Sequence, residues 1–258
     1  YQILFNILNY LSRNLDNLLV AKYFGANILG IYEKTYQVMR YPLQLFTFAI
    51  TPALQPVLTK YRDQPEKVAA AFYKVALRLA IIGAFSSTVL WWRAADVVYV
   101  LFGEQWLATV PLLQILALSI PVQMVLSSTG GVYQAFGAVK TMFWCGLFSS
   151  FTTVAAIVYG VYVQSLPVLC TALVAVFHVN FIQCIFALQR SVFAGQSWLA
   201  LYITCAVLSL SFINIGFGLG APTFPADLLT AVLNIAQTSV LTAIPAVLLL
   251  WLANRRSW

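Results

Sequence analysis

Long apolar runs constrain this chain more than any other feature of its sequence. Eight runs contain few charged side chains and are separated by charged residues or by proline and glycine. A helix of about 20 apolar residues crosses the hydrocarbon layer of a bilayer, so each run is a predicted membrane span. The runs cover residues 3–20, 41–58, 75–92, 107–129, 142–163, 166–188, 198–219 and 228–252. The predicted fold is an all-α, polytopic membrane helical bundle of about eight transmembrane helices.

The same pattern argues against several classes of protein. Only 8% of the 258 residues are charged, whereas soluble domains are roughly one quarter charged. The short connections leave no room for a soluble catalytic domain, and the chain has no GxxxxGK[ST] phosphate loop, paired-carboxylate motif or Ser/His/Asp constellation. The four cysteines form no CxxC pair and are predicted to be core residues. We therefore expect a protein that is not an enzyme, holds no metal or cofactor and binds no nucleic acid.

The net charge of +7 is unevenly distributed between the two predicted sides of the membrane. One side collects nine basic residues: Lys60, Arg62, Lys67, Lys74, Arg78, Lys140, Arg190, Arg255 and Arg256. The opposite side collects a mixture of charges: Lys22, Lys34, Arg93, Glu33, Asp96, Glu104 and Asp227. Because cytoplasmic loops are enriched in Lys and Arg, the first side is predicted to be cytoplasmic, together with both ends of the chain.

The basic segment from Asp63 to Arg78 has two interpretations. Asp63 and Glu66 have the spacing of a capping box and Pro65 suits a first helical turn, which predicts a short interfacial helix on anionic lipid. The favoured alternative is an ordinary basic loop that fixes orientation.

The first predicted span carries an unusual polar stripe. Asn6, Asn9, Arg13, Asp16 and Asn17 are three or four residues apart, or adjacent, and so share one helix face. An Arg or Asp at the centre of a membrane helix costs about 2.5 to 3.5 kcal/mol, so this face must meet protein or water. One interpretation is an intrahelical ion pair of Arg13 with Asp16. The other is a wet cavity in which Arg13 binds an anionic group and Asp16 tunes it or carries a coupling cation.

Three further features are weaker predictors of function. Arg40 precedes Pro42 at the edge of the second span, and prolines kink membrane helices beside transporter cavities. Pro121 is expected to bend the fourth span, and residues 127–131 (SSTGG) are expected to end it as a hinge or as a site of close helix packing. His178 is expected to be an interhelical residue rather than a proton relay.

Several sequence runs resemble those of bacterial polysaccharide-transporter flippases of the MOP superfamily, nearest the Wzx-type and colanic-acid-exporter-like branch. The resemblance rests on residues 14–26 (NLDNLLVAKYFGA), 29–32 (LGIY), 36–37 (YQ), 52–56 (PALQP), 96–103 (DVVYVLFG), 106 (W) and 111–117 (PLLQILA). It covers about the first 120 residues well, and the remainder by its pattern of helices.

The resemblance implies a fold, a function and partners. The family has two lobes that move undecaprenyl-pyrophosphate-linked oligosaccharides across the bacterial inner membrane by alternating access. This chain would be its second lobe (residues 1–193) with an extra helix pair (residues 194–258), and since it starts at Tyr1 we expect it to be part of a longer protein. The implied partners are the lipid-linked oligosaccharide, membrane lipids, the missing N-terminal lobe and polysaccharide polymerase or assembly proteins.

The family also suggests which residues contact the substrate. Basic cavity residues would hold the lipid pyrophosphate, and Arg13 fits that role better than Arg40 or Lys22, which could lie at the membrane edge. The other candidate cavity residues are Asp16, Asn9 and Asn17. Two alternatives remain open: a multidrug or cation antiporter of the same superfamily, which would need an acidic cavity, and a non-transporting scaffold for polysaccharide assembly, which would need no polar stripe.

Overall fold

The computed structural model describes residues 15–61, 64–193, 197–216 and 225–255, and every regular element in these ranges is a helix. Residues 15–24 form the first described helical segment. The elements that follow are α2 (Ala26–Lys60), α3 (Pro65–Trp92), α4 (Ala94–Phe102), the 3-10 helix η1 (Glu104–Thr109), α5 (Val110–Ala117), α6 (Ile120–Ala135), α7 (Val139–Tyr162), α8 (Leu166–Ser191), α9 (Ser197–Gly216) and α10 (Leu228–Arg255).

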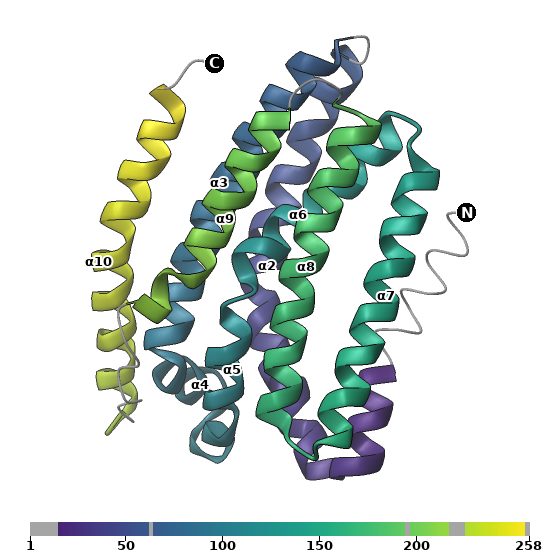
Figure 1. The fold of residues 1–258 in the computed structure, drawn as a ribbon. Helices are drawn as coiled ribbons and strands as arrows, with labels where there is room; N and C mark the ends of the chain where they lie inside the picture. Colours follow the sequence, from purple (N-terminus) through teal and green to yellow (C-terminus); the bar gives the residue numbers. More distant parts are fainter. Residues whose placement is uncertain (1–14, 62–63, 194–196, 217–224, 256–258) are drawn as a thin grey trace.

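The long helices form a bundle. Figure 1 shows α2, α3, α7, α8, α9 and α10 running along its long axis, with the short α4 at one end. Helix α7 packs on α8, α3 packs on α6 and α9, and α10 packs on α3 and α4. Both C-terminal helices thus contact α3, while the division into residues 1–193 and 194–258 stays a prediction.

The all-α, polytopic membrane fold is confirmed. Within the described residues, four helices are long and apolar enough to cross a membrane: α3, α7, α8 and residues 228–251 of α10. The pair formed by residues 104–117 and Ile120–Ala135 makes a fifth if it is one broken span. Most of the first predicted span lies outside the described residues.

The predicted loop between the first two spans is wrong. Residues 15–24 and α2 are interrupted at Gly25 alone, whose φ of 88° lies in the left-handed region that favours glycine. Helix α2 then runs for 35 residues, or about 52 Å at 1.5 Å per residue. The predicted second span, residues 41–58, is therefore only its later part, since the charged first turns still form a continuous helix.

The fourth predicted span is broken rather than gently bent. The segments before and after Leu118 and Ser119 meet at 62°. Pro121 lies in the first turn of α6, where it has no intrahelical hydrogen bond to lose. The expected end at residues 127–131 is wrong, because α6 continues to Ala135. Close packing is also absent at Gly130 and Gly131, where an added Cβ would meet no atom within 4 Å.

The basic segment after α2 is neither an interfacial helix nor a loop. From Pro65 onward it is the start of α3, which runs on to Trp92 without interruption and carries Lys67, Lys74 and Arg78. Its N-cap is Gln64, which makes no side-chain capping hydrogen bond. The expected capping residue, Asp63, lies outside the described residues.

Two glycines allow helices to approach closely. A Cβ on Gly160 of α7 would lie 2.6 Å from the Cα of Leu169 on α8, and a Cβ on Gly83 of α3 would lie 2.7 Å from the Cα of Pro121 on α6. Burial of apolar surface adds little to helix association in lipid. Small residues at such crossings favour association because they let the two backbones pack closely.

The expectation for the cysteines is confirmed for three of the four. Cys145, Cys170 and Cys184 are buried and free, whereas Cys205 is free but exposed.

The two ends of the bundle differ in charge. Figure 1 places the α2–α3 and α6–α7 junctions, the end of α8 and the C-terminal end of α10 at one end, and α4 with the α7–α8 junction at the other. Lys67, Lys140 and Arg190 belong to helix turns at the first end. Glu104 and Asp227, at η1 and just before α10, belong to the second. The structure thus keeps the two predicted groups of charges apart.

Candidate functional site

A polar stripe runs along the exposed face of α2. Glu33, Gln37, Arg40 and Gln44 are exposed and follow one another at spacings of three or four residues. Arg40 lies about 21 Å from the first residue of α2 at 1.5 Å per residue. Arg40 therefore lies well inside a long helix, and its position relative to the membrane edge stays a prediction.

Two tyrosines connect Arg40 to Asp16 on the preceding helix. The Tyr32 hydroxyl donates a hydrogen bond to Asp16 Oδ2 at 3.2 Å. The Tyr32 and Tyr36 ring centroids are 4.9 Å apart, and the Arg40 guanidinium carbon lies 5.5 Å from the Tyr36 centroid. Tyr32, Tyr36 and Arg40 are each four residues apart, so they stack along one side of α2. The rings hold a cation and a carboxylate in a fixed arrangement, since an Arg is attracted to an aromatic face.

Asp16 and Asn17 both face α2. Asp16 Oδ1 accepts a hydrogen bond from the Asn17 backbone N–H at 2.8 Å, and the Asn17 side-chain amide donates to Glu33 Oε1 at 3.1 Å. The structure therefore brings three predicted site residues together: Asp16, Asn17 and Arg40. The other predicted members of the first-span stripe, Asn6, Asn9 and Arg13, lie outside the described residues.

Lys22 lies apart from this group. It is exposed in the last turn before Gly25, and its ammonium is 5.3 Å from the centroid of the neighbouring Tyr23 ring. Figure 1 shows that this turn is at the end of the bundle. Lys22 therefore lies away from Asp16 and Arg40, and its position at the membrane edge stays a prediction.

The broken helix pair α5–α6 supports the stripe from behind. Met39 is buried next to Arg40, and its sulfur accepts contacts from Ser119 Oγ at 3.8 Å and Gln123 Nε2 at 3.6 Å. Gln123 also donates to Ser119 Oγ at 2.7 Å. Pro121 in the sequence indicates a bend close to Ser119. Nothing in the sequence shows that this bend contacts Met39.

His178 does not belong to this group. Its Nδ1 donates to the Val174 carbonyl on the same helix at 2.7 Å, and its ring stacks on Phe212 of α9 with centroids 4.8 Å apart. The expectation of an interhelical residue is confirmed through this ring contact.

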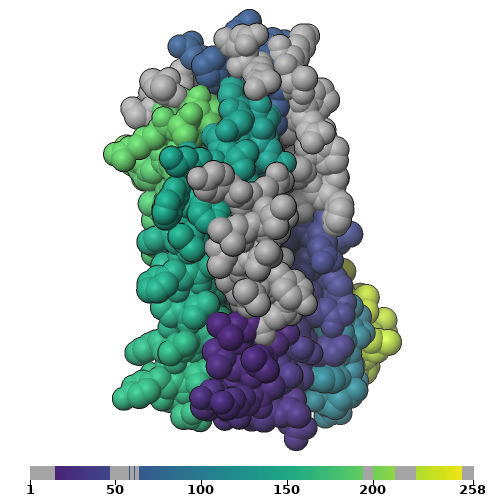
Figure 2. Space-filling model, turned by 90° about the vertical axis from the view of Figure 1, so that its right-hand side faces the viewer, coloured from purple at the N-terminus to yellow at the C-terminus, as the bar shows by residue number. Residues whose placement is uncertain are grey.

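The helices that carry the group form one face of the bundle. Figure 2 shows residues 15–24 and α2, in purple, at the lower part of this face, beside the teal of α7. Since Glu33, Gln37, Arg40 and Gln44 are exposed, the stripe faces away from the core of the described bundle.

Comparisons with known proteins agree with this membrane fold. Residues 1–111 match the family described as polysaccharide biosynthesis protein. The chain is also 28% identical over 214 residues to the lipopolysaccharide biosynthesis protein WzxC of Escherichia coli, which covers 80% of this chain and 44% of WzxC. The first 111 residues of this chain are therefore similar to this family, and most of the chain is similar to WzxC.

Two other proteins are similar over shorter stretches. An uncharacterized membrane protein of the cps region of Klebsiella pneumoniae is 33% identical over 52% of this chain and 28% of its own length. The teichuronic acid biosynthesis protein TuaB of Bacillus subtilis is 27% identical over 56% of this chain and 30% of its own. This chain thus spans less than half the length of these relatives, and no solved structure matches it. The resemblance to Wzx-type polysaccharide transporters is confirmed by these similarities.

Proposed function

We propose that this chain is the second lobe, with two further helices, of an exporter that flips undecaprenyl-pyrophosphate-linked oligosaccharides across the bacterial cytoplasmic membrane. The observation that carries the proposal is Arg40, an exposed cation well inside the 35-residue helix α2. An intramembrane ionisable residue requires a partner or a water-filled path, because the bilayer core does not solvate it. The names of the relatives support the polysaccharide part: one is described as a succinoglycan biosynthesis transport protein.

In this proposal Arg40 binds the pyrophosphate. A guanidinium presents a planar set of donors that matches phosphate oxygens two at a time. Tyr36 and Tyr32 hold the guanidinium side chain in line with Asp16, which balances part of its charge between transport cycles. Asn17 lies beside this group and donates hydrogen bonds, while Lys22 attracts the headgroup at the membrane edge. Arg13 and Asn9 are proposed as further members on the first-span stripe.

The proposed orientation follows from the charges at the two ends of the bundle. The end that carries Lys67, Lys140 and Arg190 would face the cytoplasm. Alternating access would need the preceding N-terminal lobe of the full-length protein, which rocks against this one around the stripe. Polysaccharide polymerase and assembly proteins would take up the flipped product.

The test is an export assay on the full-length protein in a strain that lacks its own copy. Arg40→Ala should reduce surface polysaccharide about 10-fold or more, because a hydrogen bond to a charged group contributes about 1.5 to 3 kcal/mol. Arg40→Lys should retain part of the activity, since it keeps the charge but loses the paired donors. Arg190→Ala, which removes an exposed arginine at the end of α8, is the matched control and should export normally. Normal export by Arg40→Ala at a normal membrane level would refute the proposed role of Arg40.

A further inference from the structure

Helix α10 has an unusual division of side chains between its two faces. The residues that face the bundle are mainly small or polar: Ala231, Asn234, Ile235, Thr238, Ser239, Thr242, Ala243 and Ala246. Most of the outward residues are large and apolar: Leu228, Leu229, Val232, Leu233, Val240, Leu241, Ile244, Val247, Leu248, Leu249 and Trp251. This arrangement suits a helix whose outward face meets lipid, and it leaves little apolar area to hold α10 on the bundle.

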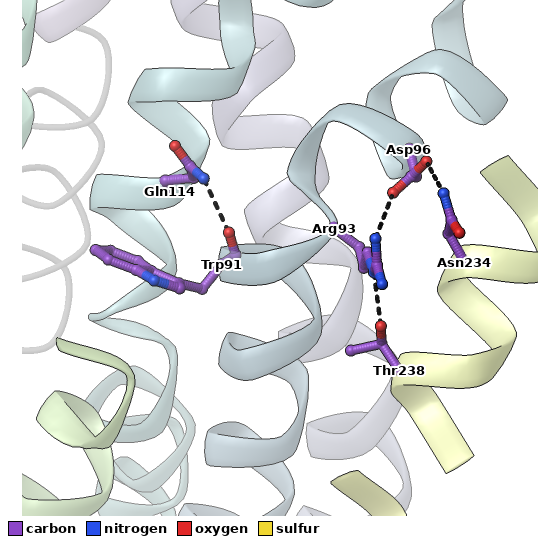
Figure 3. Close-up of polar contacts among 6 residues, drawn as sticks. All are labelled: Trp91, Arg93, Asp96, Gln114, Asn234 and Thr238. Atoms are coloured by element: carbon purple, nitrogen blue, oxygen red, sulfur yellow. Dashed lines mark hydrogen bonds and ion pairs between the residues drawn. The ribbon is translucent and has the colours of Figure 1, made fainter. Parts of the chain in front are cut away.

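Two polar contacts join α10 to the junction between α3 and α4. Arg93 Nε donates to Thr238 Oγ1 at 2.7 Å, and the Asn234 side-chain amide donates to Asp96 Oδ1 at 3.2 Å. Arg93 and Asp96 in turn form an ion pair at 3.8 Å. Figure 3 shows the four side chains converging from α10 and from the α3–α4 junction. We call Arg93, Asp96, Asn234 and Thr238 the α10 clamp.

Because part of the α10 clamp is buried, loss of its hydrogen bonds costs more free energy than loss of a contact on the surface. The Asp96 side chain is 1% exposed and that of Arg93 is 24% exposed. Buried polar groups need hydrogen-bond partners. Without the Asn234 amide and the Thr238 hydroxyl, the Asp96 carboxylate and the Arg93 guanidinium would lie in apolar surroundings. The other side of the same junction is also fixed, because Gln114 Nε2 donates to the Trp91 carbonyl in the last turn of α3 at 2.9 Å (Figure 3). The α3–α4 junction is therefore held by hydrogen bonds of its own, and α10 is attached to it through the α10 clamp.

Helix α10 also borders a cleft. An open, apolar cleft of about 200 Å³ is lined by Val38, Tyr41 and Pro42 of α2, by Phe85 and Val89 of α3, and by Ser239 of α10, which follows the clamp residue Thr238. Tyr41 and Pro42 come directly after Arg40 in α2. Ser239 thus places α10 beside a cleft that also contains the residues directly after Arg40.

We propose that Arg93 and Asp96 are positioning residues that dock α10 through Asn234 and Thr238, and that this docking sets the width of the cleft between α10 and α2. The specificity of the dock comes from matched donors and acceptors rather than from apolar area. Both hydrogen bonds to α10 cross from the α3–α4 junction to another helix, so their loss allows α10 to move away from the bundle without unfolding a helix.

The test measures the distance between α10 and α2 in the full-length protein in bilayers. Spin labels are attached at Leu45→Cys on α2 and Val240→Cys on α10, both exposed positions, in a Cys205→Ser background that removes the exposed native thiol. The protein with the intact clamp should give one narrow distance distribution. The double variant Asn234→Leu/Thr238→Val should broaden the distribution and shift its mean to longer distances. An unchanged narrow distribution would overturn the proposal.

Three further variants test whether the clamp contacts themselves cause the change in distance. Ile244→Ala/Leu248→Ala changes the outward face of α10 and should leave the distance unchanged; the same broadening there would show that any change in α10 loosens it. Asp96→Asn should broaden the distribution, and Asp96→Asn/Asn234→Asp, which exchanges carboxylate and amide across the interface, should restore it. Failure of the exchange to restore the narrow distance, with the protein inserted normally, would refute direct contact as the cause. The distance measurement does not depend on export. The proposal for the α10 clamp can therefore be refuted while the proposed function holds, and the proposed function can be refuted while the proposal for the clamp holds.

Discussion

The contact between α7 and α8 allows a direct test of the packing through a single methyl group. Gly160→Ala places a Cβ 2.6 Å from the Leu169 Cα and closer still to the Leu169 Cβ. Carbon atoms in contact are normally about 3.5 to 4.0 Å apart, so the two helix backbones must separate by about 1 Å. Overpacking of this kind costs about 1 to 3 kcal/mol. Because the Leu169 Cα belongs to the backbone, a change of side-chain rotamer cannot relieve this overlap.

The chain offers a matched control on another helix. Gly131→Ala adds the same methyl group inside α6, where an added Cβ meets no atom within 4 Å. There the substitution should be neutral or stabilising by up to about 1 kcal/mol, because glycine in a helix is less favourable than alanine.

Native thiols provide the assay. Cys170 is fully buried on α8, next to Leu169, and becomes reactive when the α7–α8 pair opens. Thermal unfolding of the full-length protein in detergent, followed with a thiol-reactive fluorophore in a Cys205→Ser background, should give a Tm for Gly160→Ala several degrees below that of Gly131→Ala. Equal Tm values for the two variants would show that α7 and α8 are not in backbone contact at Gly160.

Three further predictions concern topology, helix capping and coupling. Single cysteines at Gln64 and Glu104 should be labelled from opposite sides of the membrane, with Gln64→Cys labelled from the cytoplasm; labelling of both from one side would contradict the arrangement in Figure 1. Asp227 caps α10 by accepting a hydrogen bond from the Thr230 backbone N–H at 2.7 Å, and hydrogen bonds from the Thr230 side chain and backbone lower the pKa of its carboxyl. A lowered pKa means that the cap stabilises α10 above the pKa of the unfolded chain and is lost as the pH falls through the folded value. The protection of the Thr230 amide, relative to its intrinsic exchange rate at each pH, should therefore fall below about pH 4, and it should already be low in Asp227→Ala at neutral pH. In a reconstituted flipping assay, Asp16→Asn should lower turnover but not substrate affinity, and stimulation by an imposed ion gradient should survive; its complete loss would make Asp16 an ion site instead of a charge partner.

The membrane class and the run of helices were predictable because apolar length alone identifies a span. The later spans match this expectation: α7 and α8 begin and end within a few residues of the predicted runs at 142–163 and 166–188. Hydropathy failed for α2, since Glu33, Lys34 and Arg40 interrupt an apolar run without interrupting a helix. Only Gly25, with its positive φ, breaks the backbone there.

The contacts of the candidate site were less accessible from the sequence. The spacing of Asp16 and Asn17 predicted that one helix face is polar, but it carried no information about the partner face on α2. Tyr32 and Tyr36 resemble ordinary core aromatics until their rings are placed between Asp16 and Arg40. The α10 clamp joins residues 138 positions apart, from Asp96 to Asn234, and only the packing of α10 on α4 brings them together. Pairings of this kind depend on tertiary structure.

The length of α2 has a consequence for the membrane that surrounds it. At about 52 Å the helix exceeds a hydrocarbon layer of about 30 Å by some 20 Å. Part of this excess can be absorbed by tilting, and the remainder must stand in the headgroup region or in water. The adjoining α3 begins with Glu66 and Lys67 at the same end, so the tip of this hairpin suits an aqueous surrounding. A thicker bilayer would draw the hairpin upright and a thinner one would let it lean, which makes the angle of α2, and with it the height of Arg40, sensitive to lipid chain length.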